Sequence, residues 1–369
     1  MNIVIIGGGL AGLINAILLS RQGLSVRLYE EKRYPFHRVC GEYISNEVIP
    51  FLKKHALYPE DLLPVPISRF TLTAPSGKHL KMPLDLGGFG ISRYAFDGWL
   101  FQKAVEAGVE VIFDRVVSCE FNDDTFTIQA RETPPFLATL AIGAFGKRST
   151  LDKKLSRRFF SQRSPYVGVK YHIQTNEVPD DAIELHNFKD GYCGVSSVGA
   201  NTFNLCYLSH RGNLRQNDSI DEMERNVLAK NPHLKRIFLN STVLFDKPEV
   251  INEISFEVKE PVYNHILMSG DAAGMITPLC GNGMAMAIHS AALLSNLIIA
   301  SIRSGFNREQ LEKAYASQWN KHFSRRLWAG RNIQRLFGSE TVSEIAVRLV
   351  KSSNPLAKYL MRQTHGQPF

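Results

Sequence analysis

The first 31 residues, MNIVIIGGGLAGLINAILLSRQGLSVRLYEE, decide the fold of this chain. Residues 1–6 are a short apolar run of strand type, and the glycines that follow have the spacing G-x-G-x-x-G. Residues 10–21 then place apolar side chains with a helical period, and residues 24–29 are a second strand that ends on an acid. This order of strand, turn, helix, strand and acid is typical of a Rossmann-like unit that binds an adenine dinucleotide.

The residues of this turn each have a mechanical role. Gly7 permits the tight turn, and Gly9 lets the backbone approach a pyrophosphate. Gly12 lets the helix lie close to the sheet, and the N–H groups at the start of the helix face the phosphates. The acid at the end of the second strand can accept hydrogen bonds from the ribose hydroxyls of an adenosine. The predicted cofactor-binding residues of this unit are Gly7, Gly9, Leu10, Ala11, Gly12, Glu30 and Glu31.

Composition limits the class of protein. A chain of 369 residues, of which 44% are hydrophobic, can bury a large core and suggests two joined domains. The most apolar stretch, residues 284–302, contains His289 and several serines, so we expect a buried helix there rather than a membrane span. Five scattered cysteines lack the spacing of a zinc site or a disulfide framework, which favours a reducing cytoplasm and no metal site.

The formal net charge of +8 would attract nucleic acid, anionic lipid or acidic ligands alike. Because no recognisable nucleic-acid-binding motif accompanies this charge, we discount nucleic acid as a partner. Basic and aromatic residues alternate near the C-terminus, as in a helix that lies on a membrane surface. An ordinary helix that packs its aromatic side chains on the protein is the favoured alternative. These residues are Lys321, Arg325, Arg326, Arg331 and Arg335 with Trp319, Phe323, Trp328 and Phe337.

Beyond the N-terminal unit the sequence changes its periodicity twice. A hairpin is expected over residues 67–83, and a glycine-rich loop follows at 86–90. Between residues 166 and 209 the apolar period is two, which predicts short antiparallel strands joined by turns. A helix at 220–230 and strand-like segments up to residue 258 complete this second unit. Further elements are expected as a helix at 93–107 and strands at 109–113, 116–120, 126–130, 137–142 and 266–269.

The sequence GDAAGMITPLCGNG, residues 270–283, is the most specific motif of the chain. It places Asp271 at a strand end, then a proline-containing loop, then two glycines that open a helix. Asp271 can accept a hydrogen bond from a ribityl hydroxyl, and the glycines let the backbone pass against a flavin ring. The positive end of the helix dipole then favours reduced, anionic flavin. The motif therefore predicts FAD as the cofactor, in contact with Asp271, Gly281, Gly283 and Met284.

Three segments together resemble the FAD-dependent oxidoreductases related to geranylgeranyl reductases, which share the para-hydroxybenzoate hydroxylase fold. They are the N-terminal unit, RYAFD at residues 93–97 with Leu100, and residues 270–283. The sequence RVCGE at residues 38–42 is similar to the reductases' K/R-x-C-G-(D/E/G) element, whose cysteine lies beside the flavin. The resemblance covers most of residues 1–300. It implies that Arg38, Arg93 and the backbone at Val117 lie near the adenosine or the pyrophosphate of FAD.

The sequence departs from these relatives in ways that concern the electron donor. The loop at residues 143–149 reads GAFGKRS, with Phe145 where the hydroxylases carry the acid of an Asp-Gly pair. Ordinary hydroxylase handling of NAD(P)H is therefore not expected. The sequence also has no second G-x-G-x-x-G after a strand, so NAD(P)H, if it is the donor, would visit the flavin face transiently. Gly274 follows GDAA as in the reductases and the flavin halogenases, but the halogenases' W-x-W-x-I-P element is missing.

Candidate catalytic and substrate-binding residues lie on both units. The Cys40 thiol could relay a proton to a substrate carbon, and a buried structural cysteine is the alternative. Glu42 could orient this thiol or titrate beside it, or be a surface acid. His289 is expected to be a core histidine. A predicted apolar pocket over the flavin contains Tyr192, His172 and Phe203, which could equally form the core of the sheet.

The sequence therefore predicts an FAD-dependent oxidoreductase that transfers hydride to or from a C–C bond of an apolar prenyl, polyketide or lipid-like molecule. The alternatives are an aromatic monooxygenase of a secondary-metabolite pathway and a flavin-free prenyl-binding protein on the same scaffold. The predicted fold class is α/β, a Rossmann-like FAD-binding domain with an inserted antiparallel sheet. Its segments are the FAD-binding domain (1–65, 87–155 and 260–305), the substrate domain (66–86 and 156–259) and the C-terminal helices (306–369).

Overall fold

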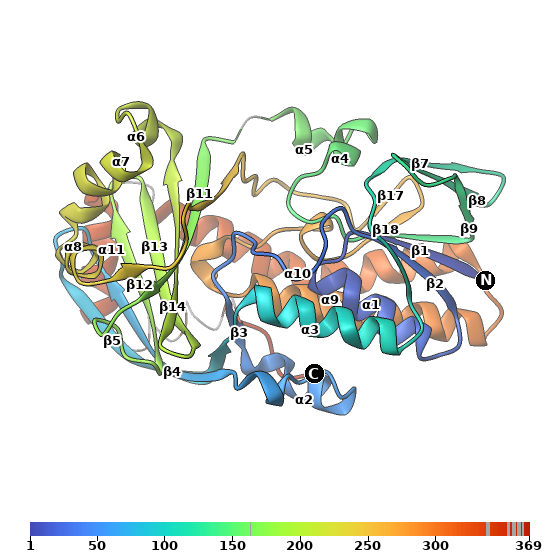
Figure 1. The fold of residues 1–369 in the computed structure, drawn as a ribbon, viewed down its shortest axis with the longest axis horizontal. Helices are drawn as coiled ribbons and strands as arrows, with labels where there is room; N and C mark the ends of the chain where they lie inside the picture. Colours follow the sequence, from blue (N-terminus) through green and yellow to red (C-terminus); the bar gives the residue numbers. More distant parts are fainter. Residues whose placement is uncertain (163, 337–339, 353–354, 356–358, 360–362, 364) are drawn as a thin grey trace.

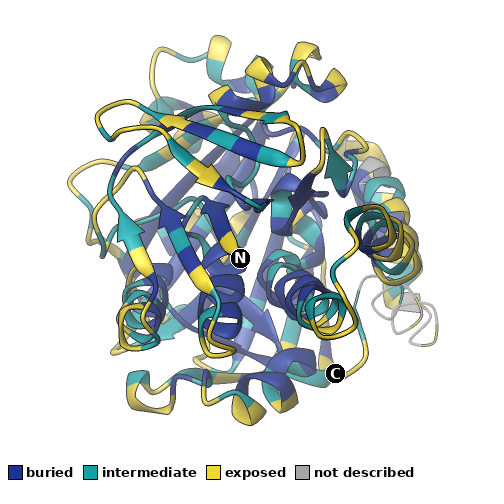
Figure 2. Ribbon diagram, turned by 90° about the vertical axis from the view of Figure 1, so that its right-hand side faces the viewer, coloured by how far each residue is buried: buried dark blue, intermediate teal, exposed yellow. Residues whose placement is uncertain are grey.

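The computed structural model describes residues 1–162, 164–336, 340–352, 355, 359, 363 and 365–369. Two sheets occupy the two ends of an elongated molecule, and long helices run along one side of the sheet that contains the N-terminus (Figure 1). Viewed toward that end, the strands and helices around the N-terminal strand are largely buried, and the exposed residues lie mostly at turns and on outer helix faces (Figure 2).

The first sheet contains the Rossmann-like unit. Its elements and those packed on it are β1 (Asn2–Ile6), α1 (Leu10–Ser20), β2 (Ser25–Tyr29), α3 (Arg93–Glu106), β6 (Glu110–Ile112), β7 (Val116–Asn122), β8 (Thr125–Ala130), β9 (Phe136–Ala138), β10 (Leu140–Gly143), β17 (Val262–Tyr263), β18 (Ile266–Met268), α9 (Gly283–Arg303) and α10 (Arg308–Leu336). The strand order is β17-β18-β10-β1-β2-β6, and every pair except β17–β18 is parallel. The central strands β1, β10 and β18 are mostly buried apolar runs, as expected where helices cover one face of the sheet and the small sheet β7-β8-β9 covers the other (Figure 1).

The second sheet is built from segments on either side of β10. Its strands are β3 (Tyr43–Ser45), β4 (Val65–Thr73), β5 (His79–Gly90), β11 (Tyr166–Gln174), β12 (Ala182–Phe188), β13 (Gly191–Gly199), β14 (Thr202–His210), β15 (Thr242–Val243) and β16 (Glu249–Asn252). They follow the order β15-β11-β14-β13-β12-β4-β5-β3, with β16 also paired to β11. One face packs against α7 (Ile220–Asn226) and α8 (Pro232–Leu239) in a separate core. The other face packs against the loop near Met275 and against α11 (Glu340–Ser352).

The architecture confirms the predicted fold class, with several local corrections. The second sheet is mixed rather than purely antiparallel, because β4 enters it from an earlier part of the chain and pairs with β12 in parallel. The expected glycine-rich loop at 86–90 is instead the last part of β5, since these residues pair with β4 and β3. The expected strand at 137–142 is interrupted at Thr139, which separates β9 from β10.

Two further corrections concern helices of the second unit. The helix predicted at 220–230 breaks at Val227, where α7 gives way to a short 3-10 turn. The segment up to 258 also contains α8, which Asn231 caps through its side chain and Pro232 begins. The predicted segments 1–65 and 87–155 assign β3 and the end of β5 to the first domain, whereas both pair within the second sheet.

The basic C-terminal residues do not form one solvent-facing stripe. Trp319 and Phe323 are buried in the first core, and Arg326 is buried in an ion pair with Glu47 (3.0 Å). Trp328 is exposed. Phe337 and the side chain of Arg335 lie outside the described residues. Trp319 and Phe323 of α10 therefore pack on the protein, as the favoured interpretation of this segment expects.

Among the described helices, α9 is long and apolar enough to cross a membrane, and half of its most apolar window is buried in the fold. It packs against α1 and α10, as the expected buried helix would.

Replacing Gly12 by Ala is expected to destabilise the first domain by about 1–3 kcal/mol, the usual cost of overpacking. A Cβ at Gly12 would lie 1.9 Å from the carbonyl oxygen of Gly7, so α1 would have to move away from β1. The gain in helix propensity, about 1 kcal/mol at most, is too small to offset this clash. Urea denaturation of Gly12→Ala measures the loss. Gly98→Ala in α3 is the control, because its Cβ would lie 3.3 Å from the side chain of Pro35, a much milder contact. An equal loss of unfolding free energy in both variants would contradict the close helix–strand packing at Gly12.

Candidate cofactor- and substrate-binding site

The glycine-rich turn packs its backbone tightly on one side and leaves it open on the other. Gly7 has a φ of +103°, and a Cβ there would lie 2.5 Å from the carbonyl oxygen of Ala144. At Gly9 the nearest group to a Cβ is the guanidinium of Arg93, at 3.7 Å. Leu10 begins α1 and lines the same open space. The turn therefore presents the start of a helix and its N–H groups to a ligand of negative charge.

Glu30 at the end of β2 is fixed against this turn. Its Oε2 accepts hydrogen bonds from the backbone N–H of Gly8 (3.0 Å) and from Nη2 of Arg38 (2.9 Å). The neighbouring Glu31 forms an ion pair with Arg115, with 3.2 Å between Oε2 and Nε. A carboxylate has about four lone-pair positions, so Glu30 can still accept a hydrogen bond from a ribose hydroxyl.

Two arginines beside the turn share one buried carboxylate. Asp97 in α3 accepts two hydrogen bonds from Arg93, both of 2.6 Å, and one from Nε of Arg38 (3.1 Å). Burial disfavours the charged form of Arg93, but Asp97 outweighs burial and raises the pKa of this guanidinium. Arg93 therefore stays charged where a pyrophosphate would need a cation.

The turn after β18 carries Asp271, and a buried lysine holds this turn in place. Gly270 has a φ of +65°, which favours glycine there. Lys259 donates from Nζ to the carbonyl oxygens of Asp271 and Lys147, both at 2.8 Å. Burial lowers the pKa of Lys259 to about 8. The turn is therefore tied to the 143–149 loop, where the hydroxylases carry their Asp-Gly pair.

A buried polar network joins the Asp271 turn to the glycine-rich unit. Asn15 in α1 donates to Oγ of Ser269 (3.2 Å) and accepts from Oγ of Ser295 in α9 (2.8 Å). Ser269 also shares a hydrogen bond with Ser290 (2.9 Å), which accepts from the N–H of Gly270 (3.0 Å). Because all these groups are buried and satisfied, the network fixes α1, α9 and the turn relative to one another.

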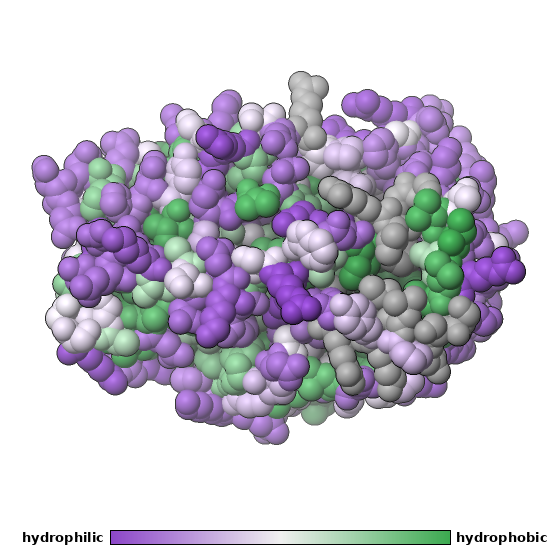
Figure 3. All heavy atoms as spheres, turned by 180° about the vertical axis from the view of Figure 1, so that it is seen from behind, coloured by the Kyte–Doolittle hydropathy of each residue, from purple (hydrophilic) through white to green (hydrophobic). Residues whose placement is uncertain are grey.

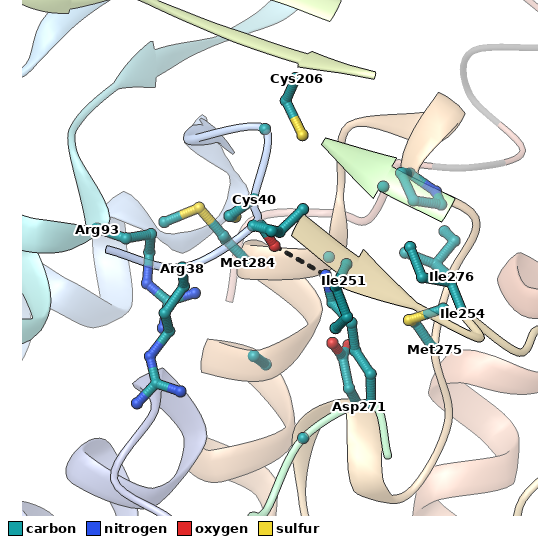
Figure 4. Close-up of a pocket in the computed structure, with 18 of the residues that line it drawn as sticks. Arg38, Cys40, Arg93, Cys206, Ile251, Ile254, Asp271, Met275, Ile276 and Met284 are labelled. Carbon is teal, nitrogen blue, oxygen red and sulfur yellow. Dashed lines mark hydrogen bonds between the residues drawn. The ribbon is translucent and has the colours of Figure 1, made fainter. Parts of the chain in front are cut away.

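One cavity of about 860 Å³ connects the two motifs. Both Glu30 and Asp271 line it, and Figure 4 shows Arg38, Arg93, Asp271 and Met284 around it. One extended ligand such as FAD could therefore reach both Glu30 and Asp271 within this cavity. The predicted cofactor-binding residues that line the cavity are Gly7, Gly9, Leu10, Ala11, Glu30, Glu31, Arg38, Arg93, Asp271, Gly281, Gly283 and Met284.

Two predicted cofactor-binding residues lie elsewhere. Gly12 packs against the backbone of Gly7, as its role in bringing the helix close to the sheet requires. Val117 is not among the residues that line the cavity, whereas Val116 is, because neighbouring residues of a strand point to opposite faces.

Cys40 lies on the cavity wall with a partly exposed side chain. Its loop is fastened on both sides: Lys147 donates to the carbonyl oxygen of Val39 (2.9 Å), and Ser196 donates to that of Gly41 (3.4 Å). Figure 4 shows Cys206 on the wall of the same cavity. Cys40 is thus partly exposed on the cavity wall and also packs against the first core.

Glu42 is a fully buried acid, so the surface alternative is wrong. Its Oε1 accepts hydrogen bonds from Nζ of Lys170 (2.5 Å) and from the backbone N–H of Arg93 (2.7 Å). Its Oε2 lies 2.6 Å from Nε2 of His172. Burial by itself would raise the pKa of Glu42, but the hydrogen bond with His172 and the charge of Lys170 outweigh burial and lower this pKa.

The cavity extends into an apolar branch between the second sheet and α11. Tyr192 lines this branch, in agreement with the prediction. His172 points instead to Glu42, and Phe203 lies on the opposite face of the sheet, in the core with α7 and α8. The apolar residues of the branch include Leu72, Leu80, Met82, Leu185, Leu208, Ile254, Met275, Ile333, Ala346 and Val350.

Several residues of the site were not predicted from the sequence. Lys147 belongs to the GAFGKRS loop that was noted for its missing acid, and its charge was a usable signal. Lys170 lies in a largely apolar strand, and because buried lysines are rarely unpaired, its position was a signal for a buried acidic partner. The contribution of Ala346 from α11 had no local signal, since it depends on how the C-terminal helix docks on the sheet.

His289 is half-buried rather than a satisfied core histidine, and its Nδ1 has no hydrogen-bond partner among the described residues. Its ring stacks on Phe369, with 3.9 Å between the ring centroids. Burial, together with the charge of nearby Arg326, lowers the pKa of His289 to about 3, so this histidine stays neutral at physiological pH.

The Glu42→Gln variant is expected to lose about 1–3 kcal/mol of folding free energy at neutral pH, since Lys170 is left buried without its carboxylate. The pKa of Glu42 is lowered in the folded state, so its ionic contribution is complete above the ordinary value of 4.5 and disappears as the pH falls through the folded value. The stability difference between wild type and variant should therefore be constant from neutral pH down to about pH 5 and shrink below it. Urea denaturation at several pH values measures it; a difference that grows on acidification would contradict the assignment.

Comparison with known proteins agrees with this geometry. Residues 5–42 match the family model described as an NAD(P)-binding Rossmann-like domain. Digeranylgeranylglycerophospholipid reductase 2 of Methanopyrus kandleri is 24% identical, and the alignment covers 98% of this chain and 91% of the relative. The digeranylgeranylglycerophospholipid reductase of Methanosarcina acetivorans is 23% identical, over 87% of this chain and 80% of the relative.

Solved structures show the same fold. The geranylgeranyl bacteriochlorophyll reductase-like protein of Thermoplasma acidophilum has a TM-score of 0.79 at 17% identity, with 98% of this chain and 95% of the other covered. The flavin-dependent brominase Bmp2 also has a TM-score of 0.79, at 18% identity, with 99% and 93% covered. The resemblance of this chain to the geranylgeranyl reductase-like flavoproteins is thus confirmed over nearly its whole length.

Proposed function

We propose that this chain is an FAD-dependent reductase that transfers hydride to a carbon–carbon double bond of an apolar, prenyl-bearing lipid or a similar molecule. The observation that carries the proposal is the single cavity that runs from Glu30 to Asp271, passes Cys40 and continues into the apolar branch. The relatives named digeranylgeranylglycerophospholipid reductases support the same substrate class.

The cofactor residues divide into two groups in this proposal. Glu30 holds the adenosine ribose, while Arg38 and Arg93 face the pyrophosphate beside the glycine-rich turn. Asp271 accepts from the ribityl chain, and Gly281 with the start of α9 faces the ring. Reduced FAD, when bound, supplies the hydride.

The second hydrogen of the new C–H pair is a proton, and Cys40 is the group that delivers it. Its thiol lies on the cavity wall, where the S–H bond can break as the carbon–hydrogen bond forms. The aliphatic lining of the branch disfavours ordered water there, so we assign the proton to a side chain of the cavity wall. Tyr192 and the aliphatic residues of the branch orient the apolar substrate.

Two partners remain predictions. NAD(P)H is the proposed transient electron donor, and it would reach the flavin face without a domain of its own. Peripheral contact with a membrane is proposed through the C-terminal helices, where Ile345, Leu349 and Trp328 are exposed. Figure 3 shows hydrophobic side chains gathered at one end of the molecule as seen from behind. A cytoplasmic location fits both partners.

Glu30→Gln and Asp271→Ala are each expected to weaken FAD binding by about tenfold or more, the usual effect of losing a hydrogen bond to a charged group. The two sites lie at opposite ends of one ligand, so both variants should release FAD more readily. Titration of the apoprotein with FAD, followed by flavin fluorescence, measures the dissociation constants. Glu110→Gln on β6, an exposed acid paired with Arg27, is the control and should bind normally. Unchanged affinity in both site variants would overturn the proposed FAD position.

The reaction is tested with FAD-loaded protein that has been reduced under anaerobic conditions and mixed with a geranylgeranyl-bearing lipid. The expected product gains two hydrogen atoms for each double bond reduced, seen by mass spectrometry. Gain of one oxygen atom in air would instead establish a monooxygenase, and a colourless protein that does not take up FAD would establish a flavin-free binder.

Cys40→Ser should lower kcat in the same assay by about 10²-fold, the usual contribution of a positioned general acid. The control is Cys119→Ser, which changes a buried thiol of the small sheet. Full activity of Cys40→Ser would show that another group donates the proton.

A further inference from the structure

A buried charge cluster links the loop that carries Cys40 to the second sheet. It consists of Glu42, Lys170 and His172, and we call it the Glu42 cluster. Glu42 and Lys170 are fully buried, and His172 is nearly so. Lys170 and His172 are two residues apart in β11, so both side chains emerge from the face of the second sheet opposite the core with α7 and α8. The carboxylate of Glu42, in the loop that follows Cys40, is thus held by two side chains of β11.

Burying the Glu42 cluster destabilises the fold unless all of its members are present. Taking a carboxylate and an ammonium group out of water costs several kcal/mol each, which a close pair with further hydrogen bonds can offset. Glu42 receives three hydrogen bonds, from Lys170, His172 and the N–H of Arg93, so every part of its carboxylate is engaged. Losing any donor therefore weakens the hold on the whole loop.

The backbone of Glu42 needs this hold. Its φ of +53° lies in the left-handed region, which costs a residue with a side chain about 1–2 kcal/mol. Such conformations persist where the surroundings over-determine them. Here the side-chain bonds of Glu42 and the bond from the N–H of Ile91 to its carbonyl oxygen (3.1 Å) supply that constraint. The strained residue lies two positions from Cys40, so the cluster sets the direction in which the loop presents its thiol.

We propose that Lys170 and His172 are positioning residues for the reduction: through Glu42 they hold residues 38–42 so that Cys40 faces the cavity and can deliver its proton. The inference rests on the proposed function for the identity of the proton donor. It adds that the second sheet, besides shaping the apolar branch, sets the position of the donor that belongs to the first domain.

The test is hydrogen–deuterium exchange of the FAD-loaded full-length chain, read on peptides that cover residues 36–44. Lys170→Met and Glu42→Gln should each speed exchange of these peptides by about tenfold or more, the effect of losing one hydrogen bond to a charged group. Lys170→Arg, which keeps the charge and the donors, should restore much of the protection. The double variant should be no faster than the faster single variant, because the two residues act through one contact.

The control is Glu184→Gln, which breaks a comparable pair with His186 (3.2 Å) within β12, a strand of the same sheet that is separated from β11 by β14 and β13. It should lower the melting temperature of the protein without speeding hydrogen–deuterium exchange in the peptides that cover residues 36–44. Equal exchange in the wild type and in both cluster variants would overturn the proposal. So would the same increase in Glu184→Gln, because the effect would then be general loosening.

A kinetic readout separates positioning from stability. In stopped-flow experiments the reduction of the bound flavin by dithionite should be unchanged in Lys170→Met, while reoxidation by the lipid substrate slows and its KM stays near the wild-type value. A raised KM with unchanged kcat would overturn the proposal. Cys40→Ser should show normal exchange at 36–44, so exchange tests the cluster even if Cys40 is not the donor and the proposed function needs another acid.

Discussion

The carboxyl ends of the parallel strands β1, β10 and β18 meet at one edge of the first sheet, and the site depends on this arrangement. In the register, Ile5 lies opposite Ile142, and Ile142 lies opposite Leu267. Two backbone hydrogen bonds continue this ladder past the strand ends, from the N–H of Ala144 to Ile6 and from that of Ser269 to Gly143. The glycine-rich turn and the Asp271 turn, which are far apart in the sequence, therefore open onto the same space. Ligands of open α/β sheets bind at this edge for the same reason.

Buried polar groups hold this arrangement in two different ways. The network around Asn15 is neutral and satisfied, and it joins α1 to α9 behind the two turns. The Glu42 cluster is charged, and it joins the loop of Cys40 to β11. The stability that a neutral network contributes changes little with pH, whereas the contribution of the charged cluster depends on the ionisation of its members. The two turns and the loop of Cys40 are thus held in place by groups of different chemistry.

The sequence was most informative where function is local. The strand, the turn and the helix of residues 1–31 follow one another, so their geometry could be deduced from glycine spacing and apolar period. The turn and helix start around Asp271 could be predicted for the same reason, because residues 270–283 are contiguous in the sequence. Features that depend on a distant partner were missed: the parallel pairing of β4 with β12, the burial of Glu42 beside Lys170, and the docking of α11. The choice between pocket and sheet core stayed open for Phe203, because alternation reveals two faces but not which of them meets the cofactor-binding domain; the structure shows the core.

The apolar branch is built without any of the residues that we propose for FAD binding. Ala346 and Val350 of α11 form part of its wall, and the opposite wall comes from strands of the second sheet. Larger or smaller side chains at these two positions would shorten or lengthen the branch and leave the nucleotide contacts as they are. The C-terminal helix thus helps to set the size of the branch independently of the turns at Glu30 and Asp271. Related proteins could acquire new substrates by changing this one helix while keeping the same coenzyme chemistry.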